Sequence, residues 1–92
     1  MDRRLKATNI TTATTTTVKS GMGVLKRIVF NKPVALSTVT IYNNTAGSGA
    51  KIGTITNTAD VKPYFLDFGS YFDTGLTIVT SGADDITVIT AA

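Results

Sequence analysis

Six aspartates are the only side-chain carboxylates of this 92-residue chain, so any acid–base or metal chemistry must use them. The chain has no Cys, His, Glu, Gln or Trp, which excludes a nucleophile–His pair and a zinc site with Cys or His ligands. The adjacent Asp84 and Asp85 could bind calcium, but calcium takes about six to eight oxygens, and the spacing of an EF-hand loop is absent. We therefore expect Asp84 and Asp85 to be solvated turn residues, and we expect no catalytic residue, metal or cofactor.

Asp73-Thr74-Gly75 has the form of an aspartic-protease signature. Such enzymes need two of these aspartates, which share one proton across a dimer axis. In retroviral-type subunits the triplet lies early in the chain and the flap follows it, whereas only 17 residues follow Gly75 here. The triplet is therefore interpreted as a turn in which Asp and Gly flank the start of a strand, and the protein is predicted not to be an enzyme.

Aromatic and basic residues are the candidates for docking to a partner. Five of the seven aromatic residues cluster within positions 64–72, and strand alternation turns Phe65 away from Tyr64 and Phe68, which are expected in the core. The whole net charge of +3 lies in residues 1–20, while the rest of the chain is neutral and has no basic stripe for nucleic acid. The predicted docking residues are Arg3, Arg4, Lys6, Phe65, Tyr71 and Phe72.

Composition predicts an all-β fold. Thr, Val and Ile supply 18, 8 and 8 residues, and β-branched side chains favour strands. Short apolar runs alternate with turn signals about every ten residues, as in a sandwich or a small barrel. The expected strands are 24–30, 38–42, 51–56, 63–68, 76–80 and 86–90. The expected core is Leu25, Val39, Ile41, Ile52, Leu66, Phe68, Leu76, Ile78, Ile86 and Val88.

The chain divides by composition into an arm and one domain. Seven of the ten residues in 8–17 are Thr, and no large apolar alternation ties them to a core. We therefore expect residues 1–17 to form an N-terminal arm, extended or disordered, outside a β-sandwich domain over 18–92. No apolar run is long enough to span a membrane, and the N-terminus lacks the apolar segment of a signal peptide. We therefore expect no membrane partner, and a protein that stays in the cytoplasm where it is made.

Three strings give the chain a resemblance to a known group of proteins. They are VKSGMGVL (18–25), VTIYNNTAGSG (39–49) and TGLTIVTSGADDITV (74–88). In this order they resemble small β-sandwich structural proteins of tailed-phage virions, both capsid decoration (cement) proteins and head-fibre or tail accessory proteins. The resemblance covers roughly residues 18–89.

The resemblance implies a fold and a function. The fold would be a jelly-roll-like antiparallel sandwich, and the function that of a non-enzymatic capsid decoration protein. Such a protein would form a homo-oligomer, often a trimer. It would bind the phage major capsid protein or another virion protein, and so reside in the virion after synthesis in the host cytoplasm. The alternative is a small carbohydrate- or receptor-binding module of a phage fibre or tail, although sugar stacking favours Trp, which this chain lacks.

Overall fold

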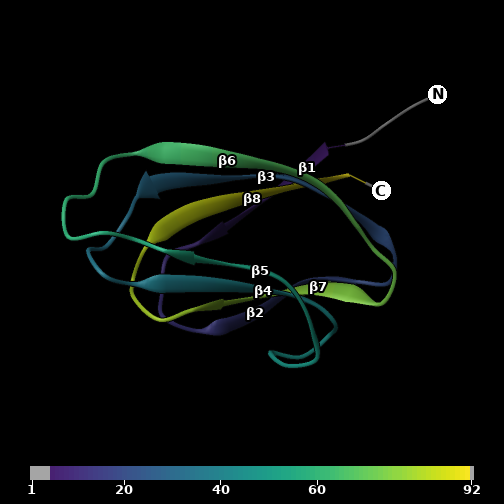
Figure 1. The fold of residues 1–92 in the computed structure, drawn as a ribbon. Coiled ribbons are helices and arrows are strands. Elements are labelled where there is room, and N and C mark those ends of the chain that lie inside the picture. The colour runs from purple at the N-terminus through teal and green to yellow at the C-terminus, as the bar shows by residue number, and fades with distance from the viewer. Residues whose placement is uncertain (1–4, 92) are drawn as a thin grey trace.

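A computed structural model describes residues 5–91, which fold into two four-stranded sheets (Figure 1). Within this range there is no helix that could cross a membrane. Sheet A has the strand order β1-β8-β3-β6, and sheet B has the order β2-β7-β4-β5. The strands are β1 (Leu5–Ile10), β2 (Thr15–Ser20), β3 (Gly23–Lys32), β4 (Thr38–Asn43), β5 (Ala50–Thr56), β6 (Tyr64–Phe72), β7 (Gly75–Thr80) and β8 (Asp85–Ala91).

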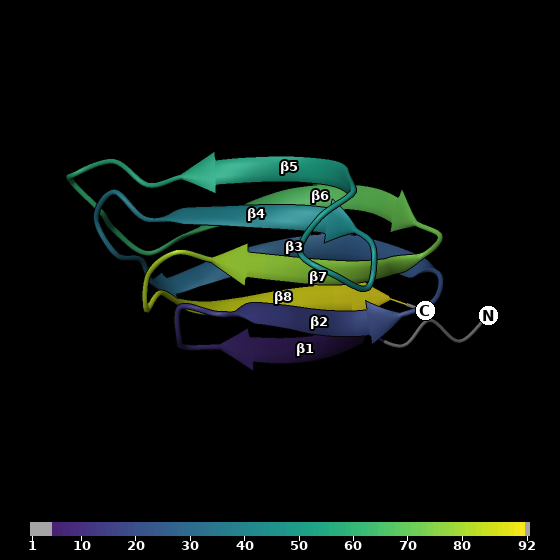
Figure 2. The same cartoon turned by 90° about the horizontal axis from the view of Figure 1, so that it is seen from below.

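The strand order follows from one long hairpin wrapped on itself. The antiparallel pairs β1–β8, β2–β7, β3–β6 and β4–β5 make a ribbon whose tip is the β4–β5 loop. Successive pairs of the ribbon alternate between the two sheets, and the pairs β3–β8 and β4–β7 join the wraps (Figure 2). This is the topology of a jelly roll. The prediction of an all-β antiparallel sandwich is confirmed.

The N-terminal segment is part of the sandwich, and the expectation of an arm outside it is wrong for residues 5–17. β1 pairs with β8 over six positions, and β2 pairs with β7. The connection between β1 and β2 is also held: the Thr80 hydroxyl donates to the Thr12 carbonyl at 2.7 Å and accepts from the Thr14 N–H at 3.0 Å. Backbone ladders and hydrogen bonds hold this segment where apolar alternation is weak.

The core lies between the sheets and contains most of the residues expected there. Seven of the ten predicted core side chains are fully buried: Leu25, Val39, Ile41, Leu76, Ile78, Ile86 and Val88. Ile52, Leu66 and Phe68 are half-buried and pack against this cluster. Ile10, Ile28, Phe30 and Phe72 complete the buried cluster between the sheets, although the sequence pattern did not single them out.

We predict that deleting residues 1–10 destabilises the protein. The deletion removes β1 and exposes the core around Ile10, whose burial alone is worth about 1.5–3 kcal/mol. Thermal unfolding followed by circular dichroism should show a lower midpoint than a control that lacks only residues 1–4 and keeps every described strand. Equal midpoints for the two truncated proteins would restore the arm interpretation.

We predict that Leu36→Gly stabilises the fold. Leu36 is the third residue of a turn closed by the Ser37 N–H to the Val34 carbonyl, and its φ is 63°. A type II turn needs positive φ at this position, which glycine adopts without steric cost. The Leu36 side chain is 70% exposed, so its removal loses little packing. Urea unfolding should show a gain of about 0.5–1 kcal/mol, and a loss would contradict this account of the turn.

Candidate functional site

The predicted docking residues fall into three groups in the structure. Phe65 and Tyr71 point outward from β6 and are 54% and 58% exposed. Lys6 lies exposed on β1. Phe72 is fully buried, so its assignment to a docking surface is wrong. Arg3 and Arg4 lie outside the described residues.

Phe72 is buried because of its position along β6. The strand runs on to Phe72, so Phe72 shares the inward face with Tyr64, Leu66 and Phe68. Its ring packs against Gly23, where an added Cβ would come within 2.8 Å of the ring. The strand expected from the sequence, 63–68, ends four residues too early. Continuing the alternation through Gly69 would have placed Phe72 correctly.

The outer face of sheet A, which carries Phe65 and Tyr71, presents apolar side chains in ordered rows. The pairing of the strands aligns outward positions across β1, β8, β3 and β6. The rows are Leu5, Ala91, Val24 and Tyr71; then Ala7, Ile89, Arg27 and Asp67; then Asn9, Thr87, Val29 and Phe65. Leu5, at one corner, is 61% exposed. This face therefore places apolar groups on either side of the row that holds Arg27 and Asp67.

Arg27 occupies the centre of this face. Its guanidinium donates to the Asp67 carboxylate, and its Cζ lies 4.3 Å from the centre of the Phe65 ring. The hydrogen bond to Asp67 holds the pKa of Arg27 above its ordinary value. The ion pair is solvent-exposed and contributes little to stability, but with Phe65 it fixes the orientation of the guanidinium plane.

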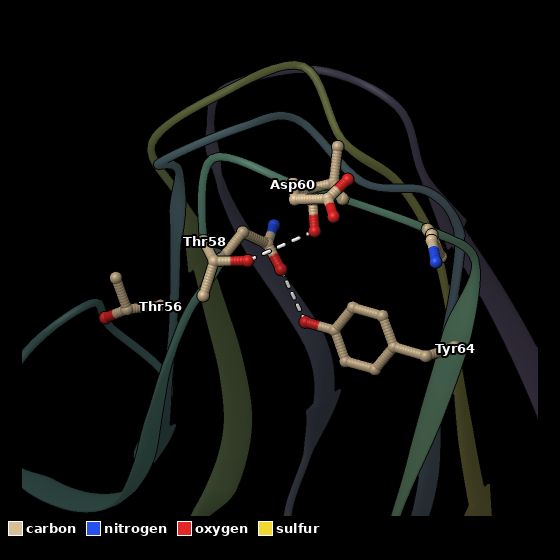
Figure 3. A pocket seen from close by; sticks show the side chains of 7 residues that line it. Thr56, Thr58, Asp60 and Tyr64 are labelled. Carbon is tan, nitrogen blue, oxygen red and sulfur yellow. Dashed lines mark hydrogen bonds between the residues drawn. The ribbon is translucent and has the colours of Figure 1, made fainter.

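A second feature is a pocket of about 390 Å³ between the β5–β6 loop and the start of β6. Figure 3 shows the Tyr64 ring reaching from β6 toward the loop that carries Thr58 and Asp60. The pocket is lined by Thr56, Asn57, Thr58, Asp60, Val61, Lys62 and Tyr64. Its charged groups are a carboxylate and an ammonium, accompanied by hydroxyls. This set suits a small molecule rich in hydroxyl groups and contains no nucleophile with an adjacent base.

Behind the pocket lies a buried polar network centred on Asp84. Asp84 is fully buried, which corrects the expectation of a solvated turn residue. Ser37 Oγ lies 2.7 and 2.8 Å from its two carboxylate oxygens, and Asn57 Nδ2 donates to it at 2.9 Å. Asp84 shares the inward parity of Ile86 and Val88, a signal in the sequence that the turn interpretation overlooked.

Tyr64 closes this network on the pocket side. Its hydroxyl donates to Asn57 Oδ1, and its ring stacks on Phe30 with centroids 4.5 Å apart. Burial, and then the charge of Asp84, raise the pKa of the Tyr64 phenol. Asn57 bonds to Val34, Ser37 and Asp84 through Nδ2 and to Tyr64 through Oδ1, so its polar atoms are already occupied within the protein.

Asp73 and Thr74 form the β6–β7 turn and Gly75 begins β7, as the sequence predicts. Asp73 Oδ1 accepts hydrogen bonds from Asn43 Nδ2 at 3.0 Å and from the Thr74 hydroxyl at 3.2 Å. These bonds, with that of Asn43 the largest contributor, lower the pKa of Asp73. Across residues 5–91, no three Asp side chains come close enough together to hold a metal ion.

No protein-family model matches the chain, and no curated protein matches it significantly.

We predict that Asp84→Asn strongly destabilises the protein. The amide would keep one acceptor oxygen where the carboxylate has two, so the hydrogen bonds from Ser37 and Asn57 could not all be kept and the buried network would lose about 1–3 kcal/mol. Urea unfolding should show this loss, while the exposed control Asp60→Asn should leave the midpoint nearly unchanged. An unchanged midpoint for Asp84→Asn would mean that the carboxylate does not hold this end of the sandwich together.

Proposed function

We propose that this chain is a non-enzymatic structural protein of a tailed-phage virion, in which it decorates the head. It self-associates and binds the major capsid protein or another virion protein. The observation that carries the proposal is the outer face of sheet A, where Leu5, Phe65 and Tyr71 are each more than half exposed. Aromatic groups are enriched at protein interfaces relative to the rest of the surface.

Two further arguments support a structural role on a viral lattice. The jelly roll recurs in capsid proteins as well as in lectins. A fold by itself does not determine function, so the resemblance of residues 18–25, 39–49 and 74–88 to virion proteins carries the phage assignment. That resemblance implies a trimer.

A carbohydrate-binding module of a phage fibre or tail is the second candidate. The observation that favours it is the pocket of about 390 Å³ beside Tyr64, which offers the Asp60 carboxylate, the Lys62 ammonium and hydroxyls to a ligand. A glycan array that gives signals lost in Asp60→Ala would support this function. A blank array would remove it.

The virion proposal predicts copies of this chain in purified particles and self-association in solution. Light scattering of the free protein should give a multiple of 9.7 kDa, and mass spectrometry should detect the chain in phage heads. Phe65→Ser combined with Tyr71→Ser should lower occupancy on the particle because it removes two exposed aromatic groups from the docking face.

The matched control is Leu36→Ser, which removes an exposed apolar side chain from the β3–β4 connection, where the Leu36 N–H donates to the Thr58 carbonyl. Leu36 is 70% exposed, so the control should bind like the unmodified protein. A strict monomer at high concentration, with no copies in any particle, would reject the proposal.

A further inference from the structure

An irregularity in β3 places two cations side by side on the outer face of sheet A. Leu25 and Ile28 are both fully buried although they are three positions apart, whereas regular alternation repeats every two. Against β8, Leu25 pairs with Thr90 and Arg27 with Ile89, so Lys26 is an extra residue of β3. The register against β6 shifts at the same place, with the extra residue on β6. Such a bulge sets two residues of one strand opposite one residue of its partner. Lys26 and Arg27 therefore both face outward.

The two cations border a hollow of about 420 Å³ in this face. Its other lining residues are Leu5 on β1, Ile89 on β8 and Asp67 on β6. This volume lies within the range of ligand pockets, roughly 300–1,000 Å³. Ile89 pairs directly with Arg27 across the sheet, so the aliphatic part of the hollow lies next to its basic wall.

The charges of the hollow do not cancel. Arg27 is paired with Asp67, and within residues 5–91 Lys26 has no ion-pair partner. The nearest outward carboxylate on β8 is Asp85, which pairs in register with Lys32 and accepts hydrogen bonds from Asn9 and Asn31. Within residues 5–91, the hollow therefore combines one cation without an ion-pair partner, a guanidinium held by Asp67, and two aliphatic side chains, Leu5 and Ile89.

We propose that this hollow receives an acidic residue flanked by an aliphatic side chain on an extended segment of a partner protein. The carboxylate of the segment pairs with Lys26 and with the free N–H groups of Arg27, and the aliphatic side chain covers Ile89 and Leu5. Arg27 is already held by Asp67 and Phe65, so it loses little conformational freedom on binding. This inference rests on the proposed docking function of the same face and specifies the chemistry of its partner.

The test uses the full-length ¹⁵N-labelled protein and two peptide probes, acetyl-Leu-Glu-Leu-amide and acetyl-Leu-Gln-Leu-amide. Addition of the Glu peptide should shift the amide signals of Lys26, Arg27 and Ile89. The Glu peptide should bind about two- to fivefold more tightly than the Gln peptide, the range expected of an exposed ion pair. This preference should vanish at about 1 M salt, where the screening length falls to about 3 Å.

Three variants separate the two parts of the site. Lys26→Gln should reduce the preference for the Glu peptide and leave the affinity for the Gln peptide unchanged. Leu5→Ser should weaken both peptides. Lys51→Gln, which removes a lysine from the outer face of sheet B, should change neither affinity.

The proposal is wrong if neither peptide shifts these three signals, or if Lys26→Gln keeps the full preference for the Glu peptide. It is also wrong if the same signals move on raising the protein concentration alone, because the occupant would then be a second copy of this chain. None of these results bears on whether the chain is present in phage heads, so the virion proposal is tested separately.

Discussion

The buried carboxylate of Asp84 is the constraint on which one end of the sandwich depends. A carboxylate removed from water must be fully hydrogen-bonded, and here its partners come from two other connections: Ser37 precedes β4 and Asn57 follows β5. Asp84 itself precedes β8. In a jelly roll the chain passes between the two sheets at both ends. This network joins three of these connections, β3–β4, β5–β6 and β7–β8. Asn43 and Asp73 tie β4 to the β6–β7 turn at the opposite end.

The period of two in the sequence is sufficient to predict the six strands β3 to β8 and most of the core, because each of these strands buries one face. Phe72 and Asp84 follow the same period. Phe72 is misplaced if its strand ends at Phe68, and Asp84 is misplaced if a polar residue of a turn is assumed to lie in water. The N-terminal segment could not be placed this way. Its attachment depends on pairing with β8 and β7, some 60 or more residues away along the chain. A threonine-rich sequence does not specify which strand it pairs with.

The bulge in β3 is a second feature that the alternation of apolar and polar residues does not predict. Strict alternation from Leu25 would put Arg27 inside and Ile28 outside, but the structure buries Ile28 and exposes Arg27. The extra residue is stable because burying a cation would cost far more than a local loss of ladder hydrogen bonds. Hence the same physical preference that keeps charge out of the core creates the paired cations of the outer face.

The edge strands of both sheets carry charges that oppose the addition of a further strand. The four edge strands β1, β2, β5 and β6 each carry one charged residue, which is Lys6, Lys19, Lys51 and Asp67 respectively, while the central strands β4 and β7 of sheet B carry none. A charge on an edge strand opposes the addition of a further strand. The outer face of sheet B is rich in threonine, and the β4–β5 loop is bonded across it through Thr17 and Thr77. The outer face of sheet A, by contrast, keeps Leu5, Phe65 and Tyr71 more than half exposed.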